Sequence, residues 1–183
     1  MKDLIFCTGF KGGIGKSFMT AAVVDYLATK SDDIVIIDSD SSIPDIYKTF
    51  NDIYKTETCN LFLDEGWSRL FSICEENNDK HIVVNCAAGA DKAFIQNIKH
   101  IKLASEILSR RLISFFMLND EKDSLNMLDK YYKETACLNN HRIAIVKNGY
   151  FGDDEIFCVY NPSQLKANIE STDGVSFYLP VLA

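Results

Sequence analysis

Glycine, lysine and serine residues near the N-terminus form a pattern that could hold phosphate groups. The segment Phe10–Ser17 reads FKGGIGKS and lies between a short apolar run and a longer segment with helical spacing. Glycines let backbone N–H groups turn toward phosphate oxygens, and a helix that begins there adds the positive end of its dipole. Lys16 would then reach the terminal phosphates, and the Ser17 hydroxyl would bind Mg²⁺. These residues predict a loop that binds ATP with Mg²⁺.

The elements that must position this loop alternate along the chain. Short apolar runs, typical of buried parallel strands, occupy residues 3–8, 34–37, 81–85, 112–118 and 142–146. Longer segments with helical spacing occupy residues 17–30, about 91–110 and 123–133. Strands that alternate with helices predict an α/β fold, a mostly parallel sheet between two helical layers. Because no linker or repeat interrupts the chain, we expect residues 1–183 to form a single domain.

Polar residues fall where these runs end. Asp38 and Asp40 follow the second run, Asn85 closes the third, and Asn148 follows the fifth. Ligands of an open parallel sheet bind beyond the carboxyl ends of its strands. Aspartate is also common in turns, and Asn-Gly is also a plain turn. Their shared position nevertheless favours one site beside the glycine loop.

The loop resembles the deviant Walker A motif of the ParA/MinD superfamily of ATPases. The pattern G-x-x-x-x-G-K-[ST] fails because Phe10 stands at its first glycine, whereas Lys11–Ser17 fits K-G-G-x-G-K-[ST] between a strand and a helix. The resemblance implies a P-loop NTPase fold. It implies nucleotide contacts from Gly12, Gly13, Ile14, Gly15, Lys16, Ser17 and Phe18. It also implies that Lys11 reaches across a dimer interface to neutralise charge on the other subunit's phosphates, as an arginine finger does.

The segment Asp38–Asp40 resembles the second motif of this family, D-x-D. The resemblance implies that Asp40 positions the attacking water and that Asp38 lies near the magnesium shell. The predicted catalytic residues are thus Lys11, Lys16 and Asp40.

One position departs from the family pattern. The third strand should end in an aspartate that holds magnesium through water, but this chain has Asn85, although the alanine–glycine turn that usually follows is present. Asparagine offers one carbonyl acceptor in place of a carboxylate, so Asn85 should hold Mg²⁺ more weakly. ATP binding survives this change, because Lys16 and the backbone amides carry it. The predicted metal-binding residues are thus Ser17, Asp38 and Asn85. The predicted activity is that of a weak ATPase.

Two further residues resemble base-binding positions of the family. Asn148 resembles the asparagine that contacts the adenine ring in many relatives. Pro180, in Tyr178-Leu179-Pro180, resembles the proline-bearing strand end that packs beside the base.

In its compact size, the chain resembles the small, single-domain branch of the superfamily. This branch includes plasmid partition ATPases and the TraL-like proteins of conjugation and mobilisation regions. This resemblance implies a switch that forms an ATP-dependent homodimer and acts with a partner protein in partition, conjugation or mobilisation. Two alternatives stay open. One is a nucleotide-sensing adaptor with little hydrolysis, which Asn85 favours. The other is a small-molecule enzyme of the dethiobiotin synthetase type. The sequence does not exclude GTP.

Composition limits the partners and the compartment. The net charge of −7 argues against a surface that grips nucleic acid as a whole, so DNA would need a local patch such as Arg110–Arg111. The chain carries neither an N-terminal signal pattern nor an apolar run near the roughly 20 residues of a transmembrane helix. We expect a cytoplasmic protein without a transmembrane segment. Its six cysteines, mostly in apolar segments, are expected to be buried and reduced.

Overall fold

Seven parallel strands form a single sheet at the centre of the molecule. The structure is a computed structural model that describes residues 2–31, 33–40 and 43–181. The strands are β1 (Asp3–Gly9), β2 (Ile34–Asp38), β3 (Lys55–Thr58), β4 (His81–Asn85), β5 (Arg111–Leu118), β6 (His141–Asn148) and β7 (Val175–Leu179). Their order across the sheet is β3-β2-β4-β1-β5-β6-β7, and each neighbouring pair is parallel. The predicted mostly parallel α/β sheet is confirmed.

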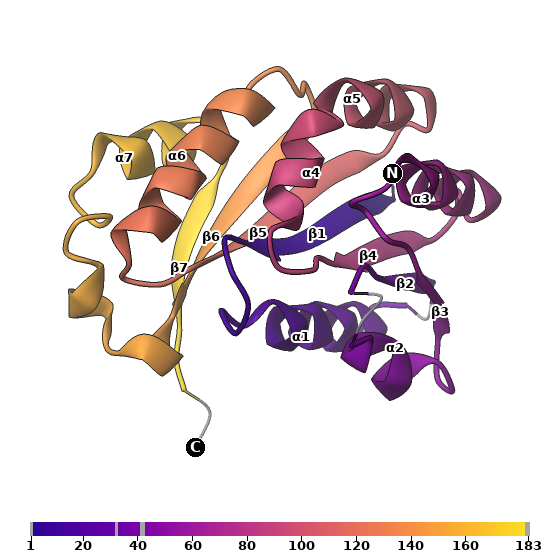
Figure 1. The fold of residues 1–183 in the computed structure, drawn as a ribbon, viewed down its shortest axis with the longest axis horizontal. Coiled ribbons are helices and arrows are strands. Elements are labelled where there is room, and N and C mark those ends of the chain that lie inside the picture. The colour runs from indigo at the N-terminus through magenta and orange to yellow at the C-terminus, as the bar shows by residue number, and fades with distance from the viewer. Residues whose placement is uncertain (1, 32, 41–42, 182–183) are drawn as a thin grey trace.

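Helices cover both faces of this sheet (Figure 1). They are α1 (Lys16–Ala28), α2 (Asp45–Phe50), α3 (Asp64–Glu76), α4 (Ala90–Gln96), α5 (Ile98–Ile107), α6 (Lys122–Thr135) and α7 (Gln164–Ser171). One apolar core lies between the sheet and α1 with α2, and a larger core lies between the sheet and the other helices. Within the described residues, no helix is long and apolar enough to cross a membrane.

Several elements differ from the sequence expectation, among them the helix near Asn97 and the edge strand β3. The helix predicted at about 91–110 is two helices, because Asn97 leaves helical geometry between α4 and α5 and its side chain donates to the Ala93 carbonyl at 3.1 Å. The edge strand β3 was not predicted, because its sequence KTET contains no apolar residue. Its hydrogen bonds to β2 define it as a strand instead.

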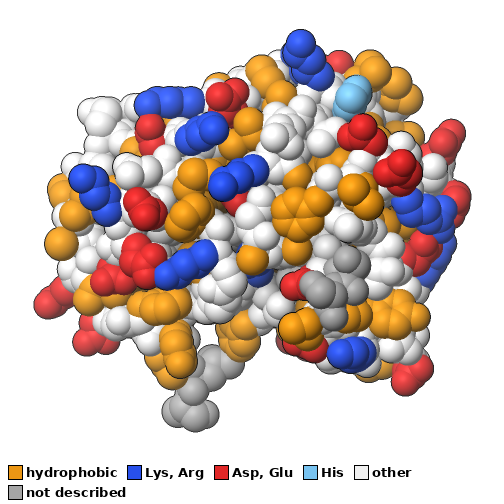
Figure 2. Space-filling view, viewed as in Figure 1, with side chains coloured by type: hydrophobic (Ala, Val, Ile, Leu, Met, Phe, Trp, Pro, Cys, Tyr) orange, Lys and Arg blue, Asp and Glu red, His pale blue; other side chains and the backbone are white. Residues whose placement is uncertain are grey.

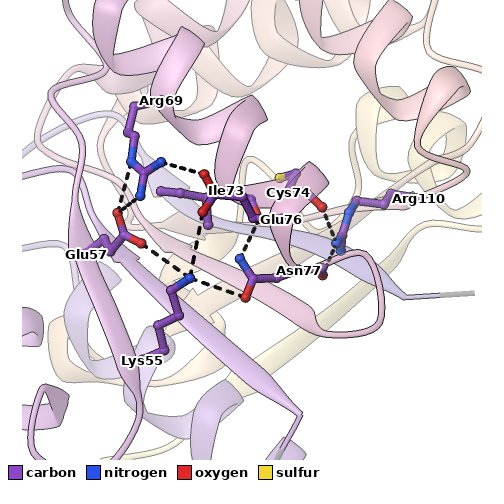
Figure 3. Close-up of polar contacts among 8 residues, drawn as sticks. All are labelled: Lys55, Glu57, Arg69, Ile73, Cys74, Glu76, Asn77 and Arg110. Carbon is purple, nitrogen blue, oxygen red and sulfur yellow. Dashed lines mark hydrogen bonds and ion pairs between the residues drawn. The ribbon is translucent and has the colours of Figure 1, made fainter.

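Arg110 is a buried cation, so the expectation that it belongs to a surface patch for DNA is wrong. Its side chain is 1% exposed. The guanidinium donates to the carbonyl oxygens of Cys74 at 2.9 Å and Asn77 at 2.5 Å (Figure 3). It also donates to the Lys80 carbonyl at 2.8 Å. Arg110 therefore joins the end of α3 to the start of β5 and is not available to a partner.

Charged groups near Arg110 also serve the fold. Arg111 pairs with the Asp3 carboxylate at 2.8 Å, which raises the pKa of Arg111. Arg69 of α3 binds Glu57 of the edge strand at 2.5 Å and Glu76 at 3.0 Å (Figure 3). The Arg69–Glu57 pair ties β3 to α3, and the Arg111–Asp3 pair ties β5 to β1.

The cysteines divide into two groups. Cys7, Cys59, Cys74 and Cys86 are buried and free, as expected, whereas Cys137 and Cys158 are exposed. The expectation of burial is therefore wrong for Cys137 and Cys158.

Candidate functional site

The glycine loop connects β1 to α1 at the carboxyl end of the central strand. Gly13 and Gly15 have φ angles of +71° and +101°, a left-handed conformation that glycine adopts without steric cost. A Cβ at Gly15 would lie 2.7 Å from Nδ2 of Asn148, so the position also excludes side chains for lack of space. Gly15 ends the loop as the residue that caps α1. The positive end of this helix therefore faces the loop.

Lys16 is turned over the loop rather than toward solvent. It is 7% exposed, and its Nζ donates to the Lys11 carbonyl at 2.7 Å. Burial lowers the pKa of Lys16, while nearby Cys86, Asp91 and Asp40 act in the opposite direction. A buried ammonium with one protein acceptor keeps donors that an anionic ligand could take.

The Lys11 side chain is partly exposed and makes an ion pair outside the loop. Its Nζ forms an ion pair with Glu121, the residue that precedes α6, and both side chains are partly exposed. The Lys11 ammonium lowers the pKa of Glu121. The Lys11 side chain thus reaches the residue that precedes α6.

A cavity of about 350 Å³ opens beside the loop. It is lined by Gly12, Gly13, Gly15, Lys16, Ser17, Phe18, Asp40, Ile43, Asp45, Asn85, Cys86 and Ala88. The fold thereby brings the predicted loop residues, Lys16 and Ser17 among them, together with Asp40 and Asn85, which are far from the loop in sequence. Asp45, in the first turn of α2, adds a carboxylate that the sequence reasoning missed.

The polar lining of this cavity suits Mg²⁺, because hydroxyl, carboxylate and amide oxygens are the donors that this hard cation takes. Ser17 is exposed at the start of α1, and Asp40 is half-buried. The described residues nevertheless contain no group of three or more His, Cys, Asp or Glu side chains that could hold a metal alone. Mg²⁺ typically keeps several waters and takes oxygens from the phosphates it accompanies, so such a sparse set fits it.

Asp38 does not line the cavity. It is fully buried, and its Oδ2 accepts the backbone N–H groups of Ile46 at 3.0 Å and Tyr47 at 3.1 Å, at the start of α2. Its Oδ1 accepts the Asp40 N–H at 3.2 Å and Nδ2 of Asn85 at 3.0 Å. Asp38 fixes the segment that carries Asp40 and would have to give up these bonds to reach a metal.

Asn85 is held by the same network. Its Nδ2 donates to Asp38, and its Oδ1 accepts the Thr20 hydroxyl at 3.2 Å. Asp38 and Asn85 are partners in the β2–β4 ladder, so the sheet itself sets this contact. The neutral amide suits this place, because a carboxylate at position 85 would face the Asp38 carboxylate.

A second cavity of about 360 Å³ adjoins the first at Gly13, Gly15 and Phe18. Its other lining residues are Asn148, Tyr150, Leu179, Pro180 and Val181. The structure therefore places Asn148 and Pro180 together, as the resemblance implies for base-binding residues. Ile14 lines neither cavity. Its side chain is buried, and its carbonyl accepts Nδ2 of Asn148 at 2.9 Å.

Glu121 and Tyr150 were missed along with Asp45. Glu121 meets Lys11 across 110 residues of sequence, and Tyr150 reaches the second cavity only because β6 ends beside β7. The only local signal was their position just after an apolar run, which is also where turns occur.

Comparisons with known proteins agree with this geometry. Residues 5–149 match the family described as the CobQ/CobB/MinD/ParA nucleotide binding domain. Over 182 residues, the chain is 33% identical to Protein MobD of Acidithiobacillus ferrooxidans. This alignment covers all of this chain and 79% of that protein.

Solved structures share the fold at lower identity. A nucleotide-binding protein from Archaeoglobus fulgidus in complex with ADP superposes with a TM-score of 0.60 at 13% identity, over 99% of this chain and 82% of that one. FlhF in complex with GTP and Mg²⁺ gives 0.61 at 17% identity, over 100% of this chain and 66% of that one. Chloroplast FtsY from Physcomitrella patens gives 0.65 at 11% identity, over 100% and 60%. From the family match and the MobD identity, the chain belongs to the CobQ/CobB/MinD/ParA family of nucleotide-binding domains.

Proposed function

We propose that the protein is an ATP-dependent switch whose two subunits associate when nucleotide is bound. The observation that carries this proposal is the Lys11 side chain, which is partly exposed and pairs with Glu121 instead of lining the cavity that Lys16 borders. From there it can reach a facing subunit more readily than its own phosphates. The proposed role in mobilisation with a partner protein rests on the resemblance to proteins of mobilisation regions, and the similarity to Protein MobD supports it.

The cavity residues divide the work of binding. Backbone N–H groups of Gly12–Ser17 and the Lys16 ammonium hold the phosphates, because an ammonium and a helix N-terminus both attract anions. The Ser17 hydroxyl holds Mg²⁺, which would neutralise charge on the phosphate oxygens when bound. Asn148 and Pro180 flank the base.

Asp40 is the proposed water-positioning group. It lines the phosphate cavity, and its Oδ1 accepts the Ile43 N–H at 3.2 Å, which fixes the carboxylate beside the loop. A carboxylate in this position can accept a hydrogen bond from water and orient it toward phosphorus.

Association releases Lys11 from Glu121. An ion pair between two partly exposed groups contributes little stability, so a nucleotide on a facing subunit can compete for the ammonium. ATP then favours the dimer because Lys11 meets phosphate charge only in the associated state.

Sedimentation with and without ATP tests the switch. We expect an ATP-dependent dimer for the wild type and none for Lys11→Ala, while Lys11→Ala monomers still bind ATP. Lys122→Ala, which removes a neighbouring exposed lysine outside the phosphate cavity, serves as the matched control. A dimer that forms equally well in Lys11→Ala would refute the switch.

A nucleotide-sensing adaptor is the second candidate, and the Asn85 network favours it. Because Asn85 is neutral and bonded to Asp38 and Thr20, no carboxylate stands at the end of β4 to hold Mg²⁺. Single-turnover ATP hydrolysis by wild type and Asp40→Ala separates the two. Hydrolysis that depends on Asp40 supports the switch, and equal negligible rates support the adaptor.

The cellular setting is part of the same proposal. We infer a cytoplasmic protein that reaches DNA through a partner. On the face shown in Figure 2, lysine and arginine side chains are scattered among acidic ones rather than gathered in one area.

A further inference from the structure

Helices α3 and α5 lie side by side on the same face of the sheet, with a groove of about 420 Å³ between them (Figure 1). The α3 wall of this groove consists of Asp64, Trp67, Ser68 and Phe71. These residues follow the spacing i, i+3, i+4, i+7, which places them on one face of the helix. Trp67 is buried and Phe71 is half-buried, so the apolar part of this wall lies deep.

The α5 wall repeats the same spacing with His100, Leu103, Ala104 and Ile107. Here the apolar side chains stand out from the surface, because Leu103 is 56% exposed and Ile107 is 70% exposed. These two residues are one helical turn apart and form an apolar ridge beside the groove. A ridge next to a groove suits a second copy of the chain, since each copy then supplies the ridge that fills the groove of the other.

The two walls are held in a fixed relation at one end. Arg110 follows α5, and its Nη2 donates to the Cys74 carbonyl near the end of α3 at 2.9 Å (Figure 3). The helices also run in the same direction, because α3 leads into β4 and α5 leads into β5, two strands of one parallel sheet. The first residues of both helices therefore lie at the same end of the groove.

At that shared end the walls carry opposite charges. Asp64 and Glu65 are exposed in the first turn of α3, whereas Lys99 and Lys102 lie near the start of α5. A twofold axis along the groove would set α3 of each copy against α5 of the other, with acidic and basic starts together. An axis across the groove would set α3 against α3, whose two ends are both acidic. Charge complementarity therefore favours the axis along the groove.

We propose that the α3–α5 groove is an interface between two copies of this protein that forms without nucleotide. The apolar ridge of each α5 packs into the groove of the other copy. The described residues that line the groove are distinct from those of the phosphate cavity, so the interface goes beyond the proposed ATP-dependent association. A single groove between two helices is a small contact, and small interfaces are weak.

Sedimentation equilibrium in the absence of nucleotide tests this interface. For the wild type, we expect a monomer–dimer equilibrium in the micromolar range. Leu103→Glu should weaken association by at least about tenfold, because the ridge would carry an unpaired charge into an apolar groove. Tyr26→Glu should leave association unchanged, since Tyr26 is an exposed side chain of α1, on the opposite face of the sheet.

Charge reversal tests the orientation of the two copies. Lys99→Glu should weaken the dimer by about threefold, as expected for an exposed pair of charges. Adding Glu65→Lys to the same chain should restore the dimer, because the two starts then exchange their signs. A dimer that the second change weakens further would overturn the axis along the groove.

The outcomes for this interface are separate from those for the ATP-dependent switch. A wild type that stays monomeric throughout the micromolar range would overturn the inference, as would a Leu103→Glu dimer as tight as that of the wild type. Adding ATP to Leu103→Glu then reports on the switch alone. If ATP does not promote association of this variant, the proposed function fails, whatever the result without nucleotide.

Discussion

The two ends of the sheet both gather charged residues, but they use them in opposite ways. At the amino end, the two terminal nitrogens of Arg110 donate to backbone carbonyls, and Arg111 pairs with Asp3. At the carboxyl end, Lys16 holds one carbonyl of its own loop and borders an open cavity. A buried cation whose terminal nitrogens donate to backbone carbonyls stabilises the fold, whereas one with donors to spare beside a cavity can bind a ligand.

Removing Arg110 should have the largest effect on stability. Arg110→Met keeps the apolar stem but removes the guanidinium donors from the carbonyls of Cys74, Asn77 and Lys80, of which Asn77 keeps the Lys80 N–H. We expect the free energy of unfolding to fall by about 4 kcal/mol, because buried polar groups lose their partners. Urea denaturation measures this. Arg142→Met, at an exposed pair with Asp173, is the control and should change stability by less than about 1 kcal/mol.

If Arg110→Met lost no more stability than Arg142→Met, the contrast between the two ends would be contradicted. The cation at the amino end would then not stabilise the fold.

His141 should make the amino end sensitive to acid. Burial lowers the pKa of His141 to about 4, and its Nε2 bonds the Ser114 hydroxyl at 2.8 Å. Between pH 6.5 and 4 the unfolded chain binds a proton that the folded protein excludes, so stability is lost as the pH falls through this window. We expect about 2 kcal/mol from this residue. Urea melts at pH 7 and 4.5 should show a smaller difference for His141→Gln than for the wild type.

His100→Gln is the control, since His100 is exposed on α5 and should leave the pH dependence intact. An unaltered pH dependence in His141→Gln would contradict the role of this buried histidine.

At the carboxyl end, Asn85→Asp should place two carboxylates against each other. Nδ2 of Asn85 lies 3.0 Å from the Asp38 carboxylate, so the new carboxylate meets a like charge and one of the two pKa values rises. A carboxyl group whose pKa is raised by folding costs stability as the pH rises above about 4. We expect a loss of about 2 kcal/mol at pH 7 that shrinks toward pH 4.

Mg²⁺ with ATP should stabilise Asn85→Asp more than it stabilises the wild type, because a bound cation offsets the repulsion between the two carboxylates. Thermal melts at both pH values, with and without Mg-ATP, measure this. A variant as stable as the wild type at pH 7 would show that Asn85 and Asp38 do not face each other.

Glu121→Gln should give the smallest effect. Losing the Glu121 carboxylate frees Lys11 for a facing subunit, and since the pair is exposed, the ATP-dependent dimer should tighten by about threefold. Sedimentation at graded concentrations reads this change. Glu134→Gln, which alters an exposed carboxylate far along α6, should leave dimerisation unchanged, and a weaker dimer in Glu121→Gln would contradict release of Lys11.

How much the sequence predicts follows from the same comparison. The apolar runs predict the central strands, because a strand buried on both faces must be apolar along its length. The edge strand β3 cannot be predicted in this way, because it pairs only with β2 and its polar sequence carries no such signal. Arg110 escapes for another reason. A pair of arginines near a helix end looks the same whether it faces solvent or backbone carbonyls.

The site divides in a similar way. The loop from Gly12 to Ser17 can be predicted because its conformation depends on local glycines. Asn148 bonds Ile14, which lies 134 positions away in sequence, and Lys11 bonds Glu121, which lies 110 positions away. Only the folded chain shows these two contacts.

The affinity of Lys16→Ala for ATP with Mg²⁺ tests the central claim most directly. Titration calorimetry on wild type, Lys16→Ala and Lys30→Ala compares the buried lysine at the cavity with an exposed lysine just after α1. We predict about a 100-fold loss of affinity in Lys16→Ala, equal to roughly 3 kcal/mol, and no loss in Lys30→Ala. Equal ATP affinity in all three proteins would contradict the assignment of the carboxyl end as a nucleotide site.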